Sequence, residues 1–171
     1  GTRHGYIESV LTELRVADRK RVRTLDPRML GMGYRSGNLP SEVIVLAARL
    51  NLVADPTEEM RKIARDLASL RERNHPPAAG SCGSFFKNPD PGAGLFAGQL
   101  SEETGLKGLR VGGAEVSTRH ANFLVNRGGA TAEDLLSLAE TVRTKVFERT
   151  GVSLEREVRV VGIGIDRKSV V

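Results

Sequence analysis

Two long segments with helical periodicity constrain the fold of this chain more than any other feature. The first segment begins at Asp55, which can cap the N-terminus of a helix, and Pro56 suits the first helical position. Its apolar residues share one face: Met60, Ile63, Ala64, Leu67 and Leu70. The second is capped by Thr131 and stopped by Gly151, with an inward face formed by Leu135, Leu138, Ala139, Val142 and Val146. A short helix is also predicted over residues 96–104.

The remaining segments have strand patterns. Residues 11–25 alternate apolar and polar side chains on both sides of Asp18-Arg19-Lys20, which predicts a hairpin. Residues 41–53 predict a buried strand, residues 106–126 predict strands broken by glycines, and residues 155–165 predict a closing strand. Helices and strands in this order indicate an α+β fold with a boundary near residues 52–57.

Composition narrows the function classes. Among 171 residues there is no apolar run near the roughly 20 that a membrane helix needs, and the single cysteine excludes an internal disulfide, as in a reducing cytoplasm. A net charge of +5 favours anionic partners, but four per cent aromatic residues and no tryptophan argue against a base-stacking nucleic-acid platform. Nucleotide phosphates or carboxylates are therefore favoured. Because the chain opens at Gly1 without methionine, we expect a piece of something longer.

The stretch GSCGSFFKNPD, residues 80–90, has the most unusual composition. Its glycine turn is either buried or bent to present Ser84 to a ligand. Cys82 is interpreted as a small buried residue rather than a nucleophile. If the segment is extended, Phe85 and Phe86 point to opposite faces and one of them belongs to the core. Lys87 and Asn88 either contact a ligand or face solvent.

Two further motifs carry charge. In GYRSG, Arg35 sits in a constrained loop, where it either grips a carboxylate with both guanidinium nitrogens or is a surface arginine. In LEREVR, Glu155 and Glu157 share one face, which by itself indicates a salt-bridged strand end. GLRVGGAEVS lacks the strand and helix that a dinucleotide-binding glycine motif needs. The residues alone thus indicate an anion-binding α+β protein.

Taken in order, YRS, GSCGSFFKNP, GLKGLRVGGAEVSTRHANFLVN and LEREVRVVG resemble the UDP-N-acetylenolpyruvoylglucosamine reductases of peptidoglycan synthesis, the MurB family, in its shorter type. The resemblance implies a cytoplasmic flavoenzyme that reduces UDP-N-acetylglucosamine enolpyruvate to UDP-N-acetylmuramate. NADPH reduces bound FAD, and the flavin passes hydride to the enolpyruvyl ether. The implied partner is a UDP-sugar, with neither nucleic acid nor membrane.

The resemblance also implies residue roles. Ser84 matches the proton donor, Arg35 the catalytic arginine of the YR loop, and Glu157 the glutamate of EVR. A serine hydroxyl is a weak acid and can protonate only a strongly basic carbon such as an enolate, whose charge Arg35 can stabilise. Substrate binding is implied for Asn88, Arg71 and His120. No flavin-contacting residue is assigned, and no metal ligand is expected.

By resemblance, residues 1–53 end an FAD-side domain and residues 54–171 form the substrate-binding domain. The family's N-terminal FAD domain is missing from this sequence, so the chain alone is expected to bind FAD weakly or not at all and can be inactive. Two departures stand out: the family has Tyr-Arg-x-Ser where this chain has Tyr34-Arg35-Ser36-Gly37, and a lysine where it has Asn74. The altered loop favours an alternative, a non-enzymatic nucleotide-sugar- or phosphate-binding module of the same fold.

Overall fold

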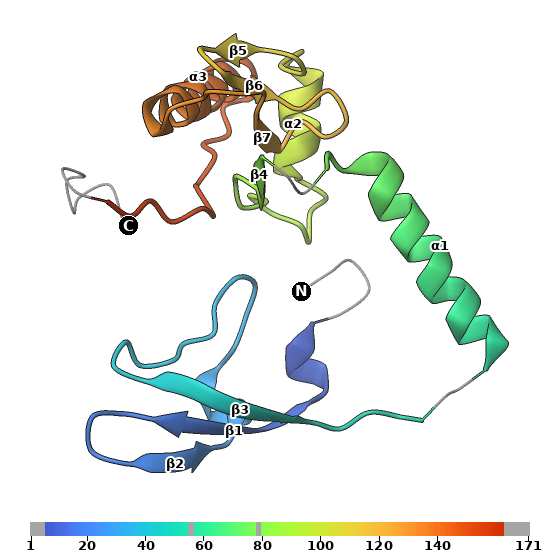
Figure 1. The fold of residues 1–171 in the computed structure, drawn as a ribbon, viewed down its shortest axis with the longest axis vertical. Coiled ribbons are helices and arrows are strands. Elements are labelled where there is room, and N and C mark those ends of the chain that lie inside the picture. Colours follow the sequence, from blue (N-terminus) through green and yellow to red (C-terminus); the bar gives the residue numbers. More distant parts are fainter. Residues whose placement is uncertain (1–5, 55–56, 78–79, 163–171) are drawn as a thin grey trace. The chain divides into compact units, whose positions relative to one another are not determined.

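The computed structural model describes residues 6–54, 57–77 and 80–162, which belong to two compact units, residues 1–60 and 61–171 (Figure 1). Both contain antiparallel strands, and helices are present as well, so the α+β class is confirmed. Asp55 and Pro56, the predicted start of the first helix, lie outside the described residues. The domain boundary at residues 53 and 54 stays a prediction. None of the described helices is both long and apolar enough to cross a bilayer.

Unit 1 is built on a three-stranded antiparallel sheet in the order β2-β1-β3. Its strands and 3-10 turns are η1 (Ile7–Ser9), β1 (Leu11–Ala17), β2 (Val22–Leu25), η2 (Pro27–Leu30) and β3 (Ile44–Leu50). The predicted hairpin is confirmed as β1 and β2. The Asp18 carboxylate closes its turn by accepting the N–H groups of Lys20 and Arg21 at 2.8 and 3.0 Å. These hydrogen bonds hold the pKa of Asp18 below its usual range.

The predicted burial of the third strand was wrong. β3 is a strand, but all seven of its residues are exposed. It pairs with β1 alone and forms one edge of the sheet, while the core of this unit consists of Leu11, Leu14 and Val16 on β1. An apolar run indicates burial only where a second layer covers it, and the described part of unit 1 places no such layer over β3.

Unit 2 carries a second antiparallel sheet, in the order β4-β7-β6-β5. Its strands are β4 (Ser81–Ser84), β5 (Arg110–Val111), β6 (Ala114–Val116) and β7 (Phe123–Asn126). The helices are α1 (Glu58–Asn74), which enters from unit 1, α2 (Ala97–Glu103) and α3 (Ala132–Thr150). α3 packs against β5, β6, β7 and α2, and these contacts enclose the core of the unit (Figure 1).

The predicted α3 is confirmed at both ends and on its inward face. The Thr131 hydroxyl accepts the Asp134 N–H at 3.1 Å and the Asp134 carboxylate accepts the Thr131 N–H at 3.0 Å, which makes a capping box. Gly151 ends the helix with φ of 72°, a left-handed conformation that glycine adopts without strain. Of the five predicted inward residues, four are buried, namely Leu138, Ala139, Val142 and Val146. The fifth, Leu135, is partly buried.

The closing strand predicted over residues 155–165 was wrong for the part that the structure describes. Between residues 155 and 162 only Arg156 forms a bridge, opposite Phe86, and the backbone is otherwise irregular. Residues 163–165 lie outside the described residues. Pairing stops early because the partner is the short segment that follows β4 rather than a full strand.

Candidate functional site

Ser84 ends β4, and the glycines around it shape that strand. Gly80 has φ of +79°, and a Cβ there would lie 2.9 Å from the Asn126 carbonyl oxygen, so only glycine fits. Gly83 has φ of +88°, but a Cβ there would meet nothing within 4 Å. The space beside Gly83 is therefore open, and Ser84 is partly exposed next to it. Of the two sequence interpretations, this geometry favours a turn that presents Ser84 to a ligand.

Two predictions for this stretch were wrong. Cys82 is exposed rather than buried, and loss of hydration nevertheless raises the pKa of its thiol, which disfavours the reactive thiolate. Phe85 and Phe86 are both in the core, 3% and 1% exposed, with ring centroids 5.2 Å apart. Regular pairing with β7 ends at Ser84, so the two-residue alternation of an extended strand is not imposed on the phenylalanines.

The C-terminal segment brings Glu157 to the same place. The Glu157 N–H donates to the carbonyl oxygen of Phe85, the residue after Ser84, at 2.9 Å. One step along, the Lys87 N–H donates to the Glu155 carbonyl oxygen at 2.8 Å, and the Lys87 ammonium forms an ion pair with the Glu155 carboxylate. The Glu155 carboxylate is exposed and engaged by lysine, whereas Oε2 of Glu157 is shielded from solvent. This difference supports Glu157 as the functional carboxylate.

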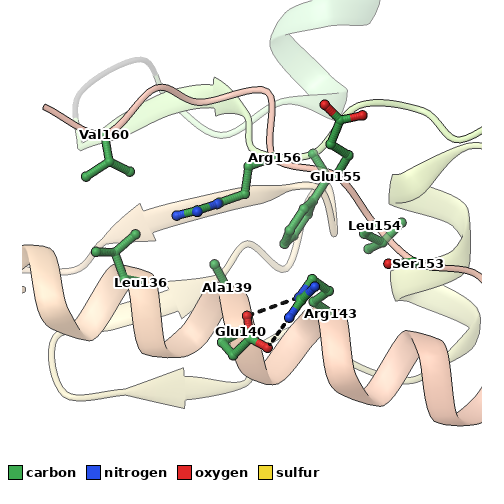
Figure 2. Close-up of a pocket in the computed structure, with 10 residues that line it drawn as sticks. Leu136, Ala139, Glu140, Arg143, Ser153, Leu154, Glu155, Arg156 and Val160 are labelled. Atoms are coloured by element: carbon green, nitrogen blue, oxygen red, sulfur yellow. Dashed lines mark hydrogen bonds and ion pairs between the residues drawn. The ribbon is translucent and has the colours of Figure 1, made fainter. Parts of the chain in front are cut away.

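A cavity of about 470 Å³ lies between the C-terminal segment and α3 (Figure 2). Apolar side chains and two arginines line it, including Phe86, Leu136, Ala139, Arg143 and Arg156. The Arg143 guanidinium donates two hydrogen bonds to the Glu140 carboxylate, at 2.6 and 3.0 Å, which lowers the pKa of Glu140. Neither Ser84 nor Glu157 lines this cavity, so it is separate from the candidate site.

Asn88 lies close to the candidate site, at the start of α2. Its Oδ1 accepts the Ala97 N–H at 3.1 Å, which satisfies a donor in the first turn of that helix. The side chain therefore has a structural contact, and its predicted role in substrate binding stays a prediction.

His120 lies beside His75 in a second cluster of unit 2, and Arg71 is close enough to His75 for its charge to act there. The His120 ring lies 5.3 Å from that of His75 and 4.9 Å from that of Phe123, and it packs so closely on α2 that a Cβ at Gly98 would lie 2.7 Å from its Cε1. Desolvation lowers the pKa of His75, and the nearby charge of Arg71 lowers it further. Sequence reasoning missed His75, whose only signal was its place before the proline pair.

This cluster predicts a pH-dependent stability of unit 2. Burial, and then the charges of His75 and Lys107, lower the pKa of His120 as well, so both imidazoles favour the neutral form when folded. The unfolded chain takes up protons at the ordinary histidine pKa of about 6.5. Stability is thus full above that value and falls as pH drops through it towards the lowered folded pKa values. Urea unfolding at pH 7.5 and 5.5 measures the loss.

The control for this pH effect is the double variant His75→Gln with His120→Gln. It should remove most of the decline between pH 7.5 and 5.5. Asp134, whose pKa is lowered by the N–H groups of Thr131 and Gly113, titrates at lower pH and does not contribute in this window. An equally steep decline in the double variant would contradict the assignment to this pair.

Arg35 belongs to unit 1, whereas Ser84 and Glu157 belong to unit 2. Mutual backbone hydrogen bonds between Gly33 and Ser36, at 3.0 and 3.1 Å, close a tight turn around Tyr34 and Arg35. Arg35 has a backbone φ of 56°, a value that residues other than glycine rarely adopt. Its guanidinium carbon lies 5.7 Å from the centroid of the Tyr34 ring. The loop is constrained, as the sequence indicated.

The strained backbone of Arg35 predicts opposite effects on stability and function. Arg35→Gly relieves the left-handed conformation and is expected to raise the free energy of unfolding of unit 1 by about 1 kcal/mol. The same change removes the guanidinium proposed to hold the substrate carboxylate, so turnover should fall by at least about tenfold. Chemical unfolding and steady-state kinetics measure the two effects. Arg35→Lys, which keeps the charge and the strain, is the control, and a destabilised Arg35→Gly would contradict the prediction.

The glycine-rich turn at the start of α3 is a candidate phosphate cradle for a flavin nucleotide, because helix N-termini bind phosphate. Three of the turn's backbone donors are already engaged. Asn126 Oδ1 accepts the N–H groups of Gly128 and Ala130, at 2.8 and 3.1 Å, and the Asp134 carboxylate accepts that of Thr131. A phosphate would have to displace a carboxylate. This turn does not fit FAD, and no flavin contact is assigned to the described residues.

Comparison with known proteins agrees with this geometry. The sequence profile described as UDP-N-acetylenolpyruvoylglucosamine reductase, C-terminal domain, matches residues 75–161, just over half of the chain. The reductase of Rubrobacter xylanophilus is 50% identical over 83% of this chain and 47% of its own length, and that of Heliobacterium modesticaldum is 40% identical over 95% and 52%. The crystal structure of the Thermus caldophilus enzyme (MurB) superposes with a TM-score of 0.77 at 39% identity, covering 92% of this chain and 56% of that one.

The fold and the matched stretch are those of a reductase C-terminal domain. The chain belongs to the family of UDP-N-acetylenolpyruvoylglucosamine reductase C-terminal domains, as the resemblance of its motifs indicated. It spans about half the length of the curated relatives it matches.

Proposed function

We propose that the protein carrying this chain reduces UDP-N-acetylglucosamine enolpyruvate to UDP-N-acetylmuramate, and that this chain supplies the substrate side of the site. The observation that carries the proposal is the pairing of Glu157 with Phe85, which sets the late glutamate motif beside the early serine motif. The relatives are named as reductases acting in this reaction, which supports the same conclusion. A cytoplasmic location fits the UDP-sugar substrate.

In the proposed reaction, FAD held elsewhere in the protein that carries this chain, and reduced by NADPH, would supply hydride chemistry at the terminal vinyl carbon of the substrate. The neighbouring carbon then carries enolate-like charge, and the Ser84 hydroxyl protonates it, so that one hydride and one proton saturate the double bond. Glu157, held beside the Ser84 segment, can share the developing negative charge only by donating a hydrogen bond from its carboxylic acid form, and Arg35 stabilises the substrate carboxylate. The open space next to Gly83 gives the enolpyruvyl group its approach to Ser84.

The proposal is tested by binding and turnover together, in the whole protein that carries this chain, because the chain alone is expected to bind FAD weakly or not at all. Calorimetric titration of the protein with UDP-N-acetylglucosamine enolpyruvate should show saturable binding, whereas a short RNA of equal charge should show none. NADPH consumption that depends on both the enolpyruvyl substrate and FAD should follow. Tight RNA binding without sugar binding, or no NADPH consumption despite sugar binding, would overturn the proposal.

The alternative is a nucleotide-sugar- or phosphate-binding module that performs no chemistry. The observation that favours it is the altered arginine loop, where the Ser36 hydroxyl donates to Asn38 Oδ1 at 2.7 Å and is thereby committed to the loop itself. Binding of the UDP-sugar without substrate-dependent NADPH consumption would select this alternative.

A further inference from the structure

Asn122 is a buried amide on the segment that leads into β7, and it holds the chain beyond Ser84 by both of its polar atoms. It is 3% exposed. Its Oδ1 accepts the N–H of Phe86 at 2.9 Å, and its Nδ2 donates to the carbonyl oxygen of the same residue at 2.9 Å. One side chain thus replaces the neighbouring strand that this peptide would otherwise need, and it satisfies a buried donor and a buried acceptor together.

The backbone of Asn122 extends this connection towards both proposed catalytic side chains. Its carbonyl oxygen accepts the N–H of Phe85 at 2.8 Å. The carbonyl oxygen of Phe85 in turn accepts the N–H of Glu157 at 2.9 Å, and Ser84 is the residue immediately before Phe85. Asn122 therefore fixes the short segment from which Ser84 projects and onto which the Glu157 segment docks.

We propose that Asn122 is a positioning residue that keeps Ser84 and Glu157 in register for the proton transfer; this role rests on the proposed function. Only an amide of this length provides an acceptor and a donor at the spacing of one peptide group. Aspartate keeps the acceptor but places a carboxylate against the Phe86 carbonyl oxygen, and alanine leaves both buried backbone groups without their partner. Either change loosens the segment by which the two catalytic side chains are aligned.

Hydrogen exchange of individual amides, followed by NMR in the full chain, tests the structural half of the proposal. In Asn122→Asp, the Glu157 amide should exchange at least about tenfold faster, while the Val142 amide in the middle of α3 keeps its rate. In Asn122→Ala, the Phe86 amide should exchange faster as well. Below the pKa of the introduced carboxyl the ratio of the Asn122→Asp rate to the unsubstituted rate should shrink, because a protonated carboxyl can again donate to the Phe86 carbonyl oxygen.

Steady-state kinetics of the NADPH reaction tests the functional half. Asn122→Asp should lower kcat by about 10²-fold, since small misplacements of reacting groups have effects of that size, with KM changed less than about threefold. The matched control is Ser101→Ala, which also alters a buried polar side chain of unit 2, one that donates only to the Ala97 carbonyl oxygen within α2. It should leave both constants and the Glu157 exchange rate unchanged.

The outcomes separate this proposal from the proposed function. If the unsubstituted protein consumes no NADPH with the enolpyruvyl substrate, the proposed function fails, and the exchange rates alone decide whether Asn122 holds the two segments. An unchanged Glu157 exchange rate, or an unchanged kcat in Asn122→Asp, overturns the positioning role. If Asn122→Ala does not fold, Asn122→Asp, which keeps the side-chain volume and the acceptor, carries the test.

Discussion

Replacing Ser84 by alanine is expected to lower kcat for reduction of the enolpyruvyl substrate by about 10²–10⁴-fold, the usual contribution of a positioned acid or base. The hydroxyl sits at the end of β4, partly exposed and next to the open backbone of Gly83. Alanine removes only the proton donor and fills no space, so KM should change little. Substrate-dependent NADPH consumption measures the effect, while exchange of the Glu157 amide confirms that the neighbouring segment stays docked.

The control is Ser81→Ala at the other end of β4. The Ser81 hydroxyl accepts the Gly83 N–H at 3.2 Å and is a local turn contact, so its loss should change kcat by less than about threefold. A Ser84→Ala protein that turns over as fast as the unsubstituted one would show that the proton comes from another group. Equal losses in both variants would show that the strand, rather than the hydroxyl of Ser84, limits the reaction.

Phe86→Ala is expected to lower the free energy of unfolding of unit 2 by about 3–5 kcal/mol. The ring is 1% exposed, is among the largest fully buried side chains, and packs edge-on against Phe85. Its removal leaves a void that joins the cavity beside α3, which the surrounding helix cannot fill without moving. Urea unfolding followed by far-ultraviolet circular dichroism measures the loss.

Phe147→Ala provides the matched control, because it removes the same ring from the exposed side of α3. That side chain is 55% exposed, so the loss should stay below about 1 kcal/mol. Equal destabilisation by the two substitutions would mean that the core of unit 2 is not organised around the segment that follows Ser84.

Local signals predicted the elements whose ends are set by neighbouring residues. The bounds of α3 could be predicted from the sequence because the signals at both ends are local. Thr131 and Asp134 form a capping box within one helical turn, and Gly151 ends the helix. The hairpin was readable for the same reason, since Asp18 satisfies the turn donors two and three residues away.

What depends on distant partners could not be predicted. The apolar pattern of β3 says nothing about whether a second layer covers it, and the alternation at Phe85 and Phe86 holds only while a strand ladder continues. The closing strand failed for a related reason, because its length is set by a partner 70 residues away. Asn122 gave only a weak signal, a polar residue within an apolar strand pattern, and its two hydrogen bonds to Phe86 become visible only in the fold.

In the candidate site, too, the sequence motifs predicted which residues matter, and only the fold showed how their segments contact one another. Motif resemblance assigned Ser84 and Glu157, and the fold then joined their segments through Phe85. Periodicity could not choose between Glu155 and Glu157, whereas the contact of Lys87 with Glu155 separates them. Arg35 was assigned by its motif alone, and its left-handed backbone is a local consequence of a turn only two residues long.

The docking of the C-terminal segment on the residues after Ser84 has a consequence for biosynthesis. The ribosome synthesises the serine motif long before Glu157, so a nascent chain can complete the β4–β7 pairing and still lack the C-terminal segment whose backbone docks beside it. A product that terminates before residue 155 would keep most of its core, and Asn122 would still hold Phe86, but the bridge between Phe86 and Arg156 would be missing. Interrupted translation is therefore expected to yield a domain that keeps most of its core but lacks the carboxylate to which the proposed function assigns a role.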